Sequence, residues 1–171
     1  MRRIAVVAVL VMALAFCGTA FAFENEPEGF RGLKWGSRPT TDMVLLKGTY
    51  SRKTYTRADE KLSLGGAELV EITYWFFLEK GGYQEKFMVA FLSFEGGENH
   101  TTLKNICKEK FGEPSKDRFN QLMWTGARSG IILDYNMVSQ RGTLMLADKN
   151  LLNRYKAQEQ EQQAKDAEKD W

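Results

Sequence analysis

Few residues of this chain have the chemistry of acids, bases, nucleophiles or metal ligands. His100 is the only histidine, and Asn99 and Thr101 flank it at the predicted start of a helix, where polar residues satisfy free backbone N–H groups. Cys107 follows seven residues later, which on a helix is a separation of about 10 Å along the axis. The two side chains could not touch, so the spacing argues against a cysteine–histidine pair.

Cys107 itself is predicted to be a buried and unreactive thiol. It shares one face of the expected helix with Leu103, Ile106 and Phe111. A free cysteine in such a position behaves as a small apolar side chain.

Other catalytic and metal-binding patterns are absent from the sequence. The run GARSG at 126–130 has its serine one place late for a nucleophile elbow and falls in a predicted hairpin turn. The acidic residues around Gly96 and Gly97 lack the spacing of a calcium loop. No cofactor or metal is expected, and only carboxylates brought together by the fold could supply catalysis.

Residues 1–22 have the pattern of a secretory signal peptide. Arg2 and Arg3 precede an uncharged, apolar run, which closes on an Ala-Phe-Ala sequence ending at Ala22. Signal peptidase requires this small-x-small pattern. We expect cleavage after Ala22 and therefore a periplasmic protein.

Two alternatives to a cleaved leader remain open. A run of about 20 apolar residues is long enough to span a bilayer as an uncleaved anchor. Cys17 lies where a lipoprotein would be acylated, although the bulky Phe16 before it is unfavourable for that processing. The Ala-Phe-Ala site favours cleavage and release without a stable membrane anchor.

The chain beyond the leader is electrically balanced. The leader carries two of the 24 basic residues and none of the 22 acidic ones, so the remainder has equal numbers of each. A protein without net charge lacks the electrostatic footprint of a nucleic-acid binder and has no strong attraction to anionic lipid.

After cleavage Cys107 would be the only cysteine left, which excludes a disulfide within the chain. The length predicts one domain over 23–156 and a polar, helical or frayed tail over 157–171.

Hydrophobic periodicity and glycine pairs predict an α+β fold built from antiparallel meanders. The expected order is helix, three strands, helix, three strands and a C-terminal helix, which hints at a duplicated unit. The expected helices lie at 40–48, from Asn99 or Thr101 to 111, and from a cap at Asp148 onward. The expected strands lie at 58–64, 67–78, 83–94, 118–125, 131–138 and 142–147. Residues 131–138 alternate apolar and polar side chains, so this part of the sheet is expected to have one wet face.

Several short motifs carry a resemblance to known proteins. They are F-x-G-x-x-W-G at 30–36, LGGA at 64–67, KFGEP at 110–114 and WTG at 124–126. Together they resemble a group of uncharacterised exported proteins of Gram-negative bacteria, a resemblance that implies no known activity. The expected element order is similar to envelope domains of the SmpA/OmlA type and to β-lactamase inhibitory proteins. That likeness implies a binding role.

The strands at 67–78 and 83–94 are apolar on both sides, so both faces of the sheet need cover. One interpretation covers one face with the helices near Leu45 and Leu103 and the turn at Leu151, and the other with residues 30–35. The second leaves a groove centred on Trp75 and Phe77 open for a partner or an apolar ligand.

The sequence therefore predicts a non-catalytic periplasmic binding or accessory module that contacts an envelope protein or an apolar ligand. An exported hydrolase based on carboxylates and a purely structural envelope component are the alternatives. Two or three acidic residues in one deep cleft would favour the hydrolase, and an open apolar patch would favour the module.

Overall fold

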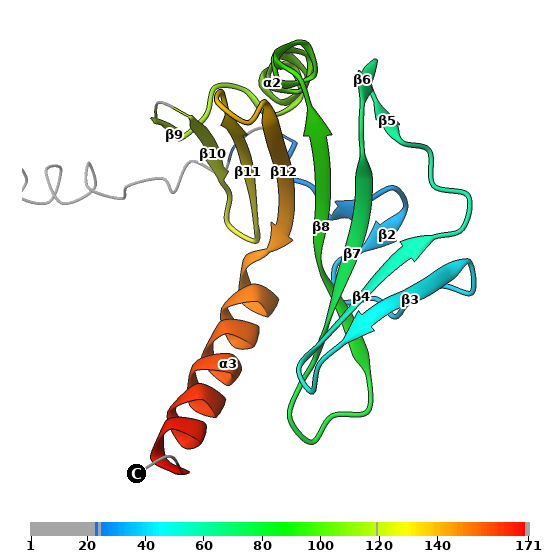
Figure 1. Cartoon of the computed structure of the whole chain (residues 1–171), viewed down its shortest axis with the longest axis vertical. Helices are drawn as coiled ribbons and strands as arrows, with labels where there is room; N and C mark the ends of the chain where they lie inside the picture. Colours follow the sequence, from blue (N-terminus) through cyan, green and yellow to red (C-terminus); the bar gives the residue numbers. More distant parts are fainter. Residues whose placement is uncertain (1–22, 24, 119, 170–171) are drawn as a thin grey trace, which may run out of the picture.

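One antiparallel sheet of eight strands organises the molecule, and helices pack on both of its faces (Figure 1). The computed structural model describes residue 23 and residues 25–118 and 120–169. The strand order across the sheet is β3-β4-β7-β8-β12-β11-β10-β9. These strands are β3 (Met43–Gly48), β4 (Arg52–Arg57), β7 (Glu71–Leu78), β8 (Glu85–Glu95), β9 (Lys116–Arg118), β10 (Gln121–Thr125), β11 (Ser129–Asn136) and β12 (Arg141–Asp148).

Two helices and two small hairpins accompany the sheet. They are α2 (Gly97–Phe111), α3 (Lys149–Lys169), β1 (Gly29–Phe30) with β2 (Leu33–Lys34), and β5 (Ser63–Leu64) with β6 (Ala67–Glu68). Four strands of the main sheet precede α2 and four lie between α2 and α3, and the two halves meet where β8 pairs with β12. We call the two sides of the sheet the α2 face and the α3 face after the helix that packs on each.

The predicted element order is wrong. The described chain is mostly β, with four main-sheet strands in each half rather than three, so the likeness to SmpA/OmlA-type domains rested on an order that is not observed. The expected helix at 40–48 is the edge strand β3. Its apolar residues are consecutive and lack helical spacing, and pairing with β4 satisfies the backbone over more residues than a single helical turn would.

Strand boundaries in the first half were also misplaced. Residues 58–62 form no strand, whereas residues 52–57, for which no element was predicted, form the polar and basic strand β4. Ion pairs stabilise this basic strand, such as Lys53 with Glu85 at 2.5 Å and Arg57 with Asp42 at 3.3 Å. In the second half, the strand expected at 118–125 is divided between β9 and β10.

A β-bulge at Met88 decides which side chains of β8 meet each face. Trp75 pairs with Val89 but Phe76 pairs with Phe87, so Met88 is an extra residue on β8. Phe87 therefore joins the α2 face and Val89 the α3 face. Strict alternation predicts Phe87 and Val89 on the same side of the sheet, and a single inserted residue reverses that assignment.

The α2 face is largely covered by the chain's own segments, although Leu45 on the edge strand β3 is 49% exposed. α2 places Leu103, Cys107 and Phe111 against the sheet. The segment around β1 and β2 lies on this same face, not on the opposite one as expected, and Trp35 stacks on Phe87 with ring centroids 4.8 Å apart. Ten of the buried sheet residues on this face are Ile72, Tyr74, Phe76, Phe87, Leu92, Phe94, Trp124, Ile131, Leu133 and Leu146.

α3 covers the other face only in part. The Asp148 carboxylate accepts a hydrogen bond from the Leu151 backbone N–H at 2.9 Å, which confirms the predicted cap. The first turns pack Leu151, Leu152 and Tyr155 on the sheet. Beyond Lys156 the helix continues to Lys169, and Gln158 still binds the chain near β7 by accepting from the Lys80 backbone N–H at 2.8 Å. Figure 1 shows α3 continuing below the end of β12.

The segment before β1 is fixed by one carboxylate. Glu26 accepts hydrogen bonds from the backbone N–H groups of Ala127, Arg128 and Ser129, at 3.1, 2.6 and 2.5 Å. Burial opposes ionisation of Glu26, but these bonds and the Ser129 hydroxyl outweigh it and lower its pKa. A side chain at Gly126 would collide with the carboxylate.

The expected signal peptide, residues 1–22, lies outside the described residues. In the part of the chain that the structure describes, neither helix combines the length and the apolar character needed to cross a membrane.

Glu26→Gln should lower the free energy of unfolding by about 1 kcal/mol at pH 7, because an amide cannot accept all the bonds of the carboxylate. Since folding lowers the pKa of Glu26, its contribution is present above the unfolded pKa of about 4.3 and is lost as the pH falls through the folded value. The variant should therefore lose less stability than the wild type on acidification, as measured by urea denaturation. Glu28→Gln, at an exposed neighbour, should match the wild type.

Thr54→Val should raise the free energy of unfolding by about 1 kcal/mol, since the buried Thr54 hydroxyl has no hydrogen-bond partner. Thr56→Val is the matched control on the same strand, because the Thr56 hydroxyl donates to the Ile72 carbonyl at 3.2 Å. We expect no increase in the free energy of unfolding for this control. Equal effects of the two changes would contradict the assignment of an unpaired hydroxyl.

Candidate functional site

His100 has a packing role rather than the geometry of a catalytic base. Its ring stacks on Tyr135, with centroids 4.6 Å apart and planes within 8°, and lies parallel to Phe94. Burial, and secondarily the charge of Lys104, lowers the pKa of His100. The ring is therefore biased toward its neutral form and closes one end of the core.

The expected cap of α2 at Asn99 or Thr101 is wrong, because the helix begins at Gly97 without a side-chain cap. Asn99 connects two elements instead. Its amide group donates to the Glu95 carbonyl at 2.8 Å and accepts from the Glu68 backbone N–H at 2.9 Å. These bonds hold the β5–β6 hairpin against the start of α2.

Cys107 is buried under α2, as predicted, with 1% of its surface exposed. Burial raises the pKa of its thiol to about 12. A thiol in this state is not a nucleophile near neutral pH.

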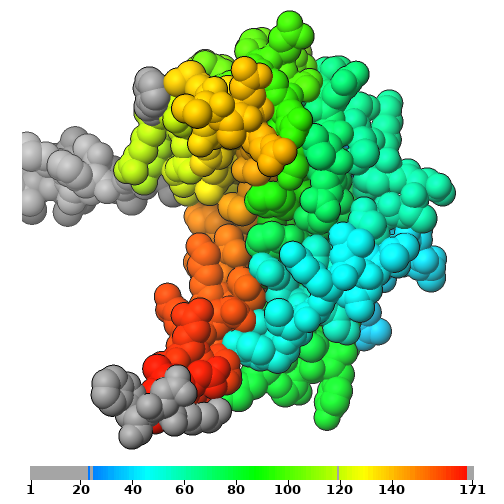
Figure 2. Space-filling model, viewed as in Figure 1, coloured from blue at the N-terminus to red at the C-terminus, as the bar shows by residue number. Residues whose placement is uncertain are grey.

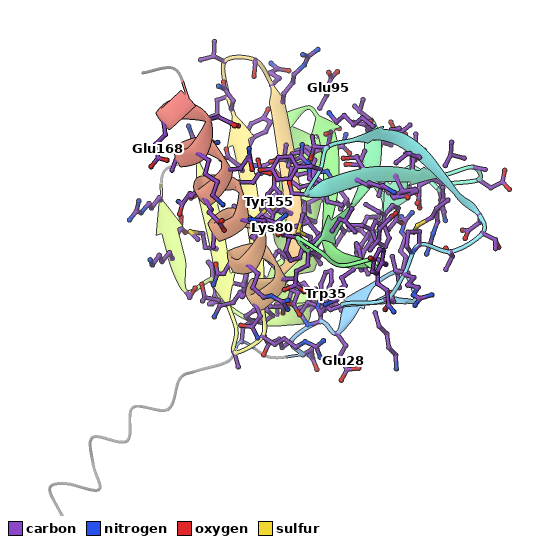
Figure 3. The ribbon with its side chains drawn as sticks, turned by 90° about the horizontal axis from the view of Figure 1, so that it is seen from below. Glu28, Trp35, Lys80, Glu95, Tyr155 and Glu168 are labelled. Atoms are coloured by element: carbon purple, nitrogen blue, oxygen red, sulfur yellow. The ribbon has the colours of Figure 1, made fainter. Side chains whose placement is uncertain are left out.

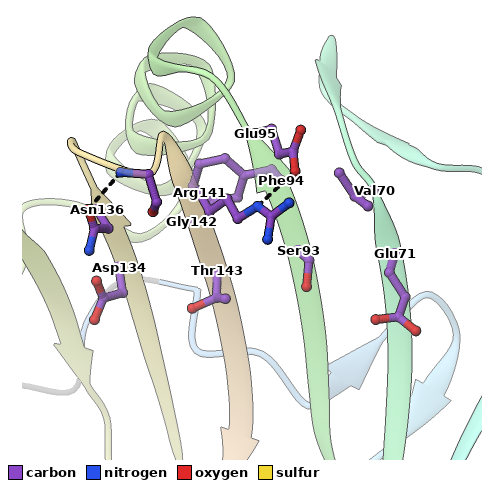
Figure 4. A pocket seen from close by; sticks show the side chains of 11 residues that line it. Val70, Glu71, Ser93, Phe94, Glu95, Asp134, Asn136, Arg141, Gly142 and Thr143 are labelled. Carbon is purple, nitrogen blue, oxygen red and sulfur yellow. Dashed lines mark hydrogen bonds and ion pairs between the residues drawn. The ribbon is translucent and has the colours of Figure 1, made fainter.

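A polar row of side chains crosses the α3 face at right angles to the strands. In order from β7 to β10 it consists of Glu71, Ser93, Thr143, Asp134 and Gln121. With residues of the β11–β12 turn, most of this row lines a cleft of about 520 Å³ (Figure 4). The row therefore supplies polar side chains to the floor of a shallow hollow whose lining also includes Val70 and Phe94.

The acidic residues of this cleft are either far from one another or already paired with a basic residue. Glu71 and Asp134 stand three strand spacings apart, which is about 14 Å between their backbones. Glu95 is paired with Arg141 at 3.0 Å, and both groups are exposed. Among the described residues, no three His, Cys, Asp or Glu side chains are placed to hold a metal ion. Glu71 and Asp134 are therefore too far apart to act as an acid pair, and Glu95 is neutralised by Arg141.

An apolar row lies next to the polar row, one step closer to α3. In order from β8 to β10 it consists of Phe91, Met145, Ile132 and Met123. All four side chains are partly exposed, whereas their neighbours on the α2 face are buried. We call the apolar row and the polar row together the open half-face.

The next row of the sheet is covered by α3. Val89 and Ala147 are buried there and contact Leu151 in one apolar cluster. Figure 2 shows α3, coloured orange to red, over the lower part of the molecule only, and Figure 3 shows the same helix from below. The open half-face begins where the cover by α3 ends.

The two residues singled out from the sequence occupy different positions on this boundary. Trp75 is half-buried, stacks on Phe91 at 5.5 Å, and has the Arg52 guanidinium 4.3 Å from its ring centre. Phe77 is 1% exposed and meets Tyr155 of α3 edge to face. Trp75 therefore adjoins the open half-face, while Phe77 belongs to the core beneath α3.

Sequence reasoning missed the four residues of the apolar row as a group. The alternation within residues 131–138 did predict one wet face, and the burial pattern of β11 confirms it. Knowing that Ile132 and Met145 are cross-strand neighbours requires the register of β11 with β12. A strand pattern alone does not supply that register.

No protein family, curated protein or solved structure matches the chain. The geometry of the described residues is therefore what carries the functional argument.

Phe77→Ala should lower the free energy of unfolding by about 3 to 5 kcal/mol, the usual cost of truncating a buried phenylalanine. Trp75→Ala should cost less, because the Trp75 ring is only half-buried and Arg52 and Phe91 can still pack together. Denaturant unfolding of the two variants measures this difference. Equal losses would mean that Trp75 is as enclosed as Phe77.

Proposed function

We propose that this protein is a non-catalytic binding or accessory module of the bacterial envelope, and that its open half-face docks another envelope protein. The supporting observation is the apolar row of Phe91, Met145, Ile132 and Met123, which stays partly exposed on a sheet whose other face is largely covered. Contiguous apolar patches on soluble domains mark interaction sites.

The separation of the carboxylates supports binding over hydrolysis. Glycoside hydrolases place their two carboxyl groups about 5 to 9.5 Å apart. Glu71 and Asp134 stand farther apart than this, and Glu95 is held by Arg141. The polar row offers fixed hydrogen-bonding groups beside an apolar stripe, which suits recognition of a surface.

The periplasmic location is part of this proposal and rests on the leader pattern at residues 1–22. In such an oxidising compartment the burial of Cys107 would protect its free thiol.

Site-specific photo-crosslinking in cells tests the docking surface. A photoreactive amino acid at Ile132 or Met145 should give an adduct with a second envelope protein, because both side chains lie on the open half-face. The same amino acid at Glu109, on the exposed side of α2, is the control and should give none. The Ile132 adduct should also disappear when Met123→Asp is introduced, since a charge would then interrupt the apolar row.

Equal adducts at Glu109, or none at Ile132 and Met145, would contradict the proposal. An adduct with the mass of two copies of the chain would also contradict it, because the surface would then serve self-association.

A further inference from the structure

The α3 face already accepts a helix on one half. α3 packs Leu151, Leu152 and Tyr155 over the row that contains Val89 and Ala147. The apolar row of the open half-face is the next row of the same sheet, and Phe91 and Met145 already touch the cluster under α3. A second helix placed beside α3 would continue this helix layer over the exposed row.

The distance by which α3 projects above the sheet restricts what can approach the open half-face. A helix with its side chains is about 10 to 12 Å across. Because α3 packs on β7, β8 and β12, it forms a wall beside the exposed rows at their β8–β12 end. A second sheet packs at about 10 Å, and α3 would obstruct a flat sheet at that distance, including the sheet of a second copy of this chain. A single helix fits beside the wall.

The dimensions of the apolar row match a short helix. From Phe91 to Met123 the row crosses three strand spacings, or about 14 Å, which is the length of about ten helical residues. Apolar side chains at i, i+3 or i+4, and i+7 of such a helix would lie along the row.

The charges of the polar row define the flank of the incoming helix. Glu71 and Asp134 form no ion pair with any described residue, and Glu95 is already matched by Arg141. Lys116 and Arg118 lie at the far end of the two rows, on the edge strand β9. The section from β7 to β11 is therefore acidic, and basic side chains on the helix would complement it.

We infer that the occupant of the open half-face is an amphipathic helix of a partner protein, with an apolar ridge on Phe91, Met145, Ile132 and Met123 and a basic flank over Glu71 and Asp134. This inference rests on the proposed function and specifies the chemistry of the partner.

Two designed helical peptides test the inference on the purified protein. Both are stapled 18-residue helices with the same leucine ridge, and one has lysines and the other glutamates on the flank. Fluorescence anisotropy should show the lysine peptide binding at least about tenfold more tightly, a difference of about 1.4 kcal/mol. Added salt should reduce the preference.

Variants connect this preference to the open half-face. Glu71→Lys with Asp134→Lys should reverse the preference, while Glu28→Lys with Glu109→Lys changes the net charge equally on exposed positions elsewhere and should leave it unchanged. Met145→Asp should weaken both peptides at least tenfold. Circular dichroism of each variant confirms that it is folded.

Equal affinity for the two peptides, no binding of either at millimolar concentration, or no reversal in the Glu71/Asp134 variant would overturn the inference. If the Ile132 crosslink to an envelope protein forms while the peptides fail, the docking surface stands and the helical partner is wrong. If neither is seen, the proposed function fails as well.

Discussion

The structure depends on one constraint, which is that the central strands β7 and β8 are apolar on both faces and must be covered twice. On β7, Tyr74 and Phe76 meet the α2 face while Phe77 meets the α3 face, and all three rings are buried. The bulge at Met88 then sends Phe87 to one face and Val89 to the other. Helices on both faces of the sheet follow from this demand, because burial of large apolar side chains is the main favourable term in folding.

The two faces satisfy this demand unequally. α2 and the small hairpins cover most of one face. The single helix α3 covers only the rows nearest the end of β12, so Met145 and Ile132 stay partly exposed in the next row. The candidate function follows from this incomplete cover of the α3 face. The apolar row stays partly exposed beside the polar row, and such an arrangement is suited to binding.

The sequence predicted local features better than pairing. Helical spacing located α2 and the buried Cys107, and Asp148 marked the start of α3. The pattern from Val44 to Leu46 wrongly predicts a helix, because an edge strand of consecutive apolar residues has no clear period. The sheet face on which Phe87 lies and the cross-strand neighbours of Ile132 could not be predicted, since a bulge and the strand register are set by long-range contacts. Trp75 was therefore found from the sequence, but the apolar row beside it was not.

The central claim is that the apolar row is uncovered in the free protein, and methionine oxidation tests it most directly. Met123 and Met145 lie in the row, Met137 is 55% exposed, and Met88 is fully buried in the bulge. Under mild peroxide, peptide mass spectrometry should show Met123 and Met145 converting to sulfoxide at rates approaching that of Met137, with Met88 protected until the protein unfolds. Protection of Met123 and Met145 equal to that of Met88 would contradict the account.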